Sequence, residues 1–172
     1  MITPAALPRL PFLAAALVAG ASLGICFLTG ISADTAIWTA VLLSLLSYLG
    51  ITDALTETVP DAATLALVGA GLGHAAATGA TLVPLVSATL LLLGIGLLLG
   101  WLTKDTGGIG SGDFFLAAGV TAWFGPLYAL DVLILTMVGL ALHSIIARKV
   151  TVAVAPSMAI ASAIIWIGGP IL

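Results

Sequence analysis

Two aspartates of this 172-residue chain stand where polar sequence meets apolar sequence. Asp53 ends one apolar stretch and Asp113 opens another. A carboxylate beside a membrane core is costly to desolvate, by roughly 2.5–3.5 kcal/mol at a helix centre, so it is a functional candidate by default. Two carboxylates held close together share one proton, so one can deprotonate water while the other polarises a carbonyl group. Such a pair has the groups that hydrolysis of a peptide bond needs, which makes Asp53 and Asp113 candidate catalytic residues.

The residues around each aspartate support this interpretation. A Pro-Asp pair follows the first aspartate by seven residues, and proline suits the first turn of a helix. Three glycines precede the second aspartate at alternate positions, which lets other backbone, including an extended peptide substrate, come close to its carboxylate. An acidic residue at a helix start is favoured by the helix dipole. The predicted supporting residues are Pro60, Asp61, Gly108, Gly110 and Gly112.

The composition restricts the kind of protein that carries these residues. Apolar side chains make up 62% of the chain and charged ones 6%, too few to coat a water-soluble globule or to keep a chain disordered. Four Lys and Arg residues cannot neutralise a run of phosphates, which excludes nucleic-acid binding. The single cysteine, Cys26, permits no intrachain disulfide. An all-α, polytopic membrane bundle forming a single domain over residues 1–172 is therefore expected.

Apolar runs predict about six to seven spans. A span needs about 20 mostly apolar residues. The run 114–146 is too long for one crossing and contains Phe124-Gly125-Pro126, a natural turn, so it predicts two spans. The remaining spans are expected at 10–30, 35–52, 62–78, 82–102 and 152–172.

The basic residues predict the orientation of this bundle. If the spans alternate in direction, Arg9, Lys104, Arg148 and Lys149 all fall on one face. Cytoplasmic loops are enriched in Lys and Arg, so this face, the N-terminus and both candidate aspartates are expected to be cytoplasmic. The ends of the second and fifth spans should then pack side by side there.

Several other residues are expected to be structural. Asp131 should cap a helix or extend to the outer interface, and His74 and His143 should pack as ordinary side chains. The glycine series 69-71-73 and 94-96 should allow helices to approach closely.

Taken together, the motifs resemble those of the type IV prepilin peptidases, aspartic proteases of the GxGD class. The resemblance rests on Asp53 with Pro60-Asp61, on the Gly-x-Gly-x-Gly-Asp motif over 108–113, on 119–125, and on the proline-containing segment 154–159. It implies an endopeptidase that removes the short basic leader of type IV prepilin-like precursors at the cytoplasmic face of the bacterial inner membrane. It also implies that neither a metal nor an organic cofactor is needed.

The resemblance further implies the partners of the chain. These are a prepilin or pseudopilin substrate, the lipid bilayer and, in a homo-oligomer, further copies of the chain, but no nucleic acid. Glu57 is a candidate contact for the basic leader. The chain resembles the short family forms that lack an N-terminal segment with paired cysteines, so no methyltransferase activity is expected.

Two alternative functions remain open at this point. Phe115 stands where the family usually has a lysine, which is compatible with a catalytically inactive assembly protein of the same fold. A small transporter could instead bind a hard cation through oxygen ligands. The candidate ligands for that cation are Asp53, Glu57, Asp61 and Asp113.

Overall fold

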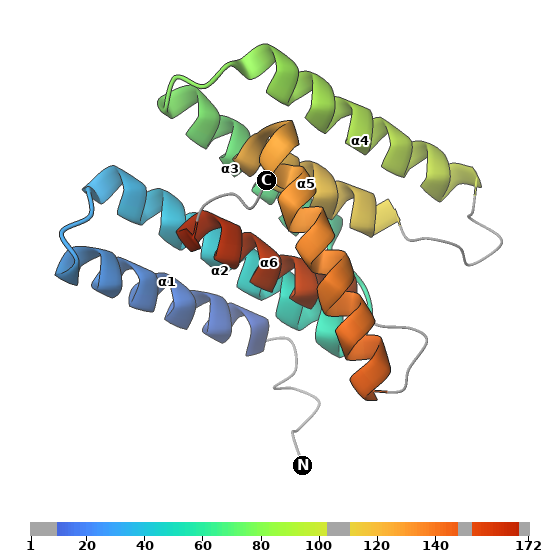
Figure 1. Ribbon diagram of the computed structural model, residues 1–172, viewed down its shortest axis with the longest axis horizontal. Helices are drawn as coiled ribbons and strands as arrows, with labels where there is room; N and C mark the ends of the chain where they lie inside the picture. Colours follow the sequence, from blue (N-terminus) through green and yellow to red (C-terminus); the bar gives the residue numbers. More distant parts are fainter. Residues whose placement is uncertain (1–9, 103–110, 148–152, 169–172) are drawn as a thin grey trace.

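The computed structural model describes residues 10–102, 111–147 and 153–168, and these residues form helices joined by short connections (Figure 1). The expected all-α fold is confirmed. The helices are α1 (Leu10–Leu28), α2 (Ala33–Thr56), α3 (Asp61–Ala77), α4 (Leu82–Leu102), α5 (Ser111–Ala147) and α6 (Val154–Gly168).

Four of these helices, α1, α2, α4 and α5, are long and apolar enough to cross a membrane. The other two are shorter, with 17 residues in α3 and 15 in α6. The expected seventh span is present as α6, and the end of that span, 169–172, lies outside the described residues. The largest boundary difference is at α2, which continues to Thr56 where an end near residue 52 was expected.

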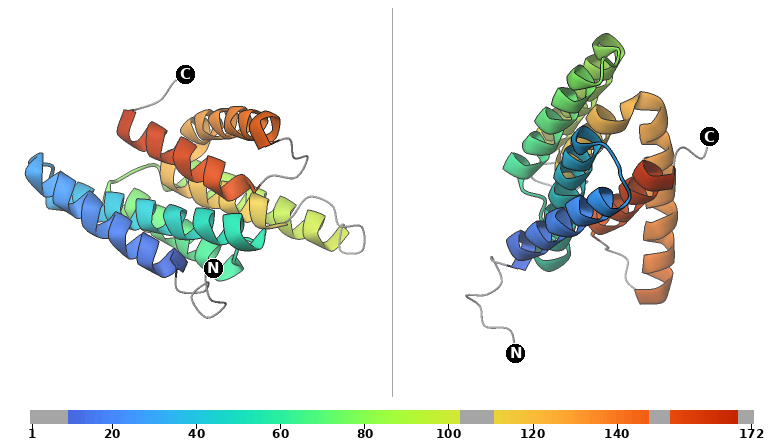
Figure 2. Two further views of the ribbon diagram at one scale, coloured as in Figure 1. Left: turned by 90° about the horizontal axis from the view of Figure 1, so that it is seen from below. Right: turned by 90° about the vertical axis from the view of Figure 1, so that its left-hand side faces the viewer.

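The predicted break in the long apolar run is confirmed inside α5. Gly125 has φ 78° and ψ 165°, a backbone region open essentially to glycine alone, and Pro126 follows it. The second half of α5 (orange) therefore runs steeply across the direction of the other helices (Figures 1 and 2). The first half packs against α3 and α4, whereas residues of the second half pack against α6.

The core lies where α2, α3, α5 and α6 meet. Its fully buried side chains come from all four helices, while α1 packs on α2, and α4 packs on α3 and α5. In a membrane, such association depends on close packing and hydrogen bonds more than on exclusion of water. The largest core residues are Leu42, Leu46, Leu49, Leu67, Leu116, Val120, Trp123, Val132, Met158 and Ile165.

Close packing of α3 on α5 centres on Gly71. A Cβ atom at this position would lie 2.8 Å from the carbonyl carbon of Ala122 and 2.9 Å from the backbone nitrogen of Trp123. The Trp123 indole N–H donates a hydrogen bond to the Leu67 carbonyl oxygen at 2.9 Å. The motif around Trp123 thus joins α5 to α3.

The expectation that the glycine series allow helices to approach closely is confirmed most clearly for one glycine of each series. Gly71 contacts α5 closely, and a Cβ at Gly96 would lie 2.8 Å from the Phe114 Cβ. Gly69 and Gly94 have no atom within 4 Å of an added Cβ. Because a helix presents each residue to a different direction, only some glycines of such a series face a neighbour.

Candidate active site

Asp53 lies inside the protein, in the last turn of α2. Its residue is 5% exposed. The Ala155 backbone N–H, in the first turn of α6, donates a hydrogen bond to Asp53 Oδ2 at 2.9 Å. Although Asp53 ends an apolar stretch of the sequence, it does not border water at the end of a span, because α2 extends past it and α6 covers it.

Asp113 lies in the first turn of α5 and is half-buried. The Asp53 carboxylate is close enough to act on the charge of Asp113 by a direct electrostatic interaction. The fold therefore brings together the two aspartates that the sequence analysis selected, one from the end of α2 and one from the start of α5.

Within the described residues the backbones of the two helices that carry these aspartates do not lie next to each other, although their side chains meet, as at Trp38 and Trp123, whose ring centroids are 6.0 Å apart. The expectation that the ends of the second and fifth spans pack side by side is therefore wrong for the backbones of these two helices. Instead, α3 and α6 each pack against both α2 and α5. The two carboxyl groups interact because α3 and α6, which both pack on α2 and on α5, hold these two helices in position.

The loop between α2 and α3 completes this arrangement. A Cβ at Gly112 would lie 3.1 Å from the Val59 Cβ, so the residue before Asp113 rests against the loop that follows Asp53. The sequence analysis expected foreign backbone to approach here, and the structure places the chain's own loop at this glycine. A side chain at Gly112 would have to displace Val59.

We expect Gly112→Ala to reduce activity by roughly tenfold, because a shift of a few tenths of an ångström in Asp113 misaligns the reacting groups. Stability should fall only modestly, because the contact of 3.1 Å is relieved once the loop that carries the Val59 Cβ shifts by a few tenths of an ångström. The double variant Gly112→Ala/Val59→Gly, which removes the Val59 Cβ atom, should recover most of the activity in a peptide-cleavage assay. A double variant as impaired as the single one would contradict this account.

The other site residues predicted from the sequence, Glu57, Pro60 and Asp61, lie in or beside this loop between α2 and α3. Glu57 ends α2 in the left-handed conformation, φ 53° and ψ 30°, which costs roughly 1–2 kcal/mol for a residue with a side chain. Pro60 caps α3, and its carbonyl oxygen accepts hydrogen bonds from the N–H groups of Ala63 and Thr64 at 3.1 Å. Asp61 is the first residue of α3 and is exposed, as is Glu57.

Some of the residues for which the sequence makes predictions lie outside the described residues. Gly108 and Gly110 are among them, so their place at the rim of the site stays a prediction. The orientation of the bundle also stays a prediction, because all of the residues that carry it lie outside the described ranges. These are Arg9, Lys104, Arg148 and Lys149.

Asp131 differs from its expected place. It is 2% exposed and lies in the second half of α5, so extension to the interface is wrong. Its neighbours Ala129 and Val132 are buried too, whereas Leu127, Tyr128 and Leu130 are exposed. The turn at Gly125 sets the direction of the second half of α5 and points this face into the protein.

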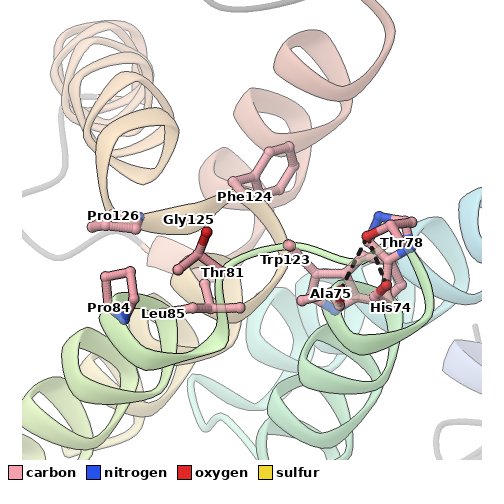
Figure 3. A pocket seen from close by; sticks show the side chains of 11 residues that line it. His74, Ala75, Thr78, Thr81, Pro84, Leu85, Trp123, Phe124, Gly125 and Pro126 are labelled. Atoms are coloured by element: carbon pink, nitrogen blue, oxygen red, sulfur yellow. Dashed lines mark hydrogen bonds between the residues drawn. The ribbon is translucent and has the colours of Figure 1, made fainter.

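A separate pocket of about 160 Å³ lies at the other end of α3 (Figure 3). It is lined by His74 of α3, by Thr78 directly after α3, by the start of α4 and by the turn at Gly125. The His74 ring stacks on Trp123 with a centroid distance of 5.3 Å and also contacts Trp38 and Trp166. Since α3 rises 1.5 Å per residue, this pocket is about 20 Å from Asp61 and is separate from the aspartates.

The acidic residues do not form a cation site in the part of the chain that the structure describes. That part includes Asp53, Glu57, Asp61 and Asp113, and no three His, Cys, Asp or Glu side chains in it gather as metal ligands would. The arrangement instead offers two interacting carboxyl groups, one buried and one half-buried, which suits proton exchange with a bound water molecule.

One component of the site was missed by the sequence analysis. The Ala155 N–H is a backbone group, and no residue type identifies it. The only signal was the proline at position 156, which is typical of a first helical turn and marks the start of α6.

The comparisons with known proteins agree with these motifs. A family model described as the type IV leader peptidase family matches residues 40–147, which is more than half of the chain. No curated protein and no solved structure matches.

Proposed function

Because the chain belongs to the type IV leader peptidase family, we propose that it is an active aspartic endopeptidase with Asp53 and Asp113 as its catalytic residues. Membership of this family and the apolar helices make it a multi-pass membrane protein of a protease family. The observation that carries the finer proposal is the electrostatic interaction between the two carboxyl groups, which come from different helices.

The proposed substrate is a type IV prepilin-like precursor, cut at the end of its short basic leader. Cleavage takes place at the cytoplasmic face of the bacterial inner membrane, with the N-terminus of the enzyme on that side. The basic residues support this orientation because cytoplasmic loops are rich in Lys and Arg.

In the proposed reaction, the ionised carboxylate takes a proton from water as the water oxygen bonds to the scissile carbonyl carbon. The protonated carboxyl group gives its proton to the carbonyl oxygen, which forms a neutral tetrahedral diol. As the C–N bond breaks, the proton held by the first carboxyl group passes to the leaving nitrogen, and a diol proton returns to the second carboxylate. Burial strengthens these interactions, because charges act on each other more strongly away from bulk water.

The exposed acidic loop is the proposed contact for the leader. Glu57 and Asp61 are exposed and flank the loop that follows Asp53. Glu57→Gln is expected to lower kcat/KM for a basic-leader peptide about two- to fivefold through KM, the size of a surface ion pair.

The matched control for Glu57 is Asp34→Asn, which removes an exposed carboxylate at the opposite end of α2 and should leave KM unchanged. Raised ionic strength should abolish the difference between Glu57→Gln and the parent. An effect of Glu57→Gln on kcat alone would contradict a role in holding the leader.

The experiment that tests the proposed function is cleavage by the purified protein in detergent. The substrate is a synthetic peptide with a basic leader and an apolar continuation, and mass spectrometry identifies the products. A single cut that requires both aspartates supports the proposal. An intact peptide after prolonged incubation with well-folded protein would favour the inactive assembly protein.

A further inference from the structure

We infer that the N-terminus of α6 assigns different roles to the two aspartates. Asp53 carries the negative charge and deprotonates the water molecule, and Asp113 carries the proton. This inference rests on the proposed function and deepens it. It also makes α6 part of the site, although α6 lies outside the matched residues 40–147.

The first observation is the hydrogen bond from the Ala155 N–H to Asp53 Oδ2, 2.9 Å long and buried. An N–H donor stabilises a carboxylate more than a neutral carboxyl group. Ala155 is also the second residue of α6, where the free N–H groups of a helix favour negative charge. Asp53 is 5% exposed, so bulk water does not surround its carboxylate and weaken this hydrogen bond.

The second observation explains why α6 reaches Asp53. A Cβ at Gly50 would lie 3.3 Å from the Pro156 Cα and 3.6 Å from the Ala155 carbonyl oxygen. The start of α6 therefore rests on α2 one turn before Asp53. The packing of two helices, and not a mobile side chain, positions the donor.

The third observation concerns Asp113. Within the described residues its carboxyl group accepts no hydrogen bond, although it stands in the first turn of α5. A direct hydrogen bond to a charged group is stronger than the effect of a helix dipole alone. The charge on Asp53 acts on Asp113, so one carboxyl group holds the proton, and of the two it is Asp113 that has no donor among the described residues.

Within the part of the chain that the structure describes, no other charged group competes for this assignment. The group that faces Asp53 from α5 is Asp113. The first turn of α6, Val-Ala-Pro-Ser, has no titratable side chain, and Asp61 of α3 and Glu57 of α2 are exposed. In this scheme Ala155 is a positioning residue, which acts on the reaction through Asp53.

The test removes the Ala155 N–H. Replacing the amide before Ala155 by an ester, in protein made by cell-free synthesis, deletes the donor and leaves the side chain in place. Ala155→Pro does the same in the first helical turn, where proline is tolerated. We expect kcat/KM at neutral pH to fall roughly 10- to 100-fold. The acidic limb of the pH–rate profile should move upward by about one to two pH units.

Val154→Pro is the matched control, because it adds a proline one residue earlier and keeps the Ala155 N–H. Its acidic limb should stay at the pH of the parent. If the ester variant loses activity equally at all pH values, or keeps full activity, the inference is overturned. The ester variant decides the matter where the proline variant does not fold.

A second measurement needs no substrate. In protein labelled with ¹³C in the aspartate carboxyl groups, infrared spectroscopy at neutral pH should show a protonated-carboxyl band. Part of this band should disappear in Asp113→Asn. Asp131→Asn is the control, because Asp131 is another buried aspartate of α5. An unchanged band in Asp113→Asn overturns the inference. The predicted loss in a protein that never cleaves peptide would instead reject the proposed function alone.

Discussion

Asp53→Asn and Asp113→Asn are each expected to reduce peptide cleavage by at least about a thousandfold, the scale seen when one member of a catalytic unit is removed. Asparagine can neither take a proton from water nor give one to the carbonyl oxygen, so the shared-proton mechanism fails with either substitution. The measurement is single-turnover cleavage of a basic-leader peptide by purified protein in detergent.

Both variants should remain folded. The asparagine side chain has the size of aspartate, and its oxygen can still accept the hydrogen bond that the Ala155 N–H donates to Asp53. Asp34→Asn, at the exposed start of the same helix, should keep activity close to that of the parent. Cleavage by either catalytic variant at more than a tenth of the parent rate would reject the assignment of that aspartate.

The largest expected loss of stability follows Gly71→Ala, at about 3 kcal/mol. The added methyl group would lie 2.8 Å from the carbonyl carbon of Ala122 and 2.9 Å from the backbone nitrogen of Trp123. Because these are backbone atoms, no side-chain rotation relieves the overlap, and α3 must move away from α5. The separation should also weaken the hydrogen bond from Trp123 to the Leu67 carbonyl.

Gly69→Ala is the matched control for this prediction. It makes the same change two residues earlier on α3, where an added Cβ meets no atom within 4 Å. It should be neutral or raise stability by up to about 1 kcal/mol, because alanine favours the helix over glycine. The two variants are compared by thermal or detergent-induced unfolding. Equal stabilities would show that close packing at Gly71 does not hold α3 against α5.

The sequence by itself determined the helical class, the two candidate aspartates and the break in the long apolar run. These features depend on local chemistry. A run of about 20 apolar residues predicts a span. A carboxylate at the edge of such a run is a candidate functional residue because it is costly to desolvate. Gly125 before Pro126 predicts a turn because few other residues adopt the backbone angles found there.

Only the tertiary structure decided which groups surround the aspartates. Asp53 is buried because α6, about a hundred residues further along the chain, supplies the Ala155 N–H. Gly69 and Gly71 are the same residue type two positions apart, yet one faces open space and the other faces the backbone of α5. Asp131 is buried because the turn at Gly125 directs its helix face inward. Local sequence sets which residues are helical, whereas the partners of each helix face depend on how distant helices cross and how closely they approach.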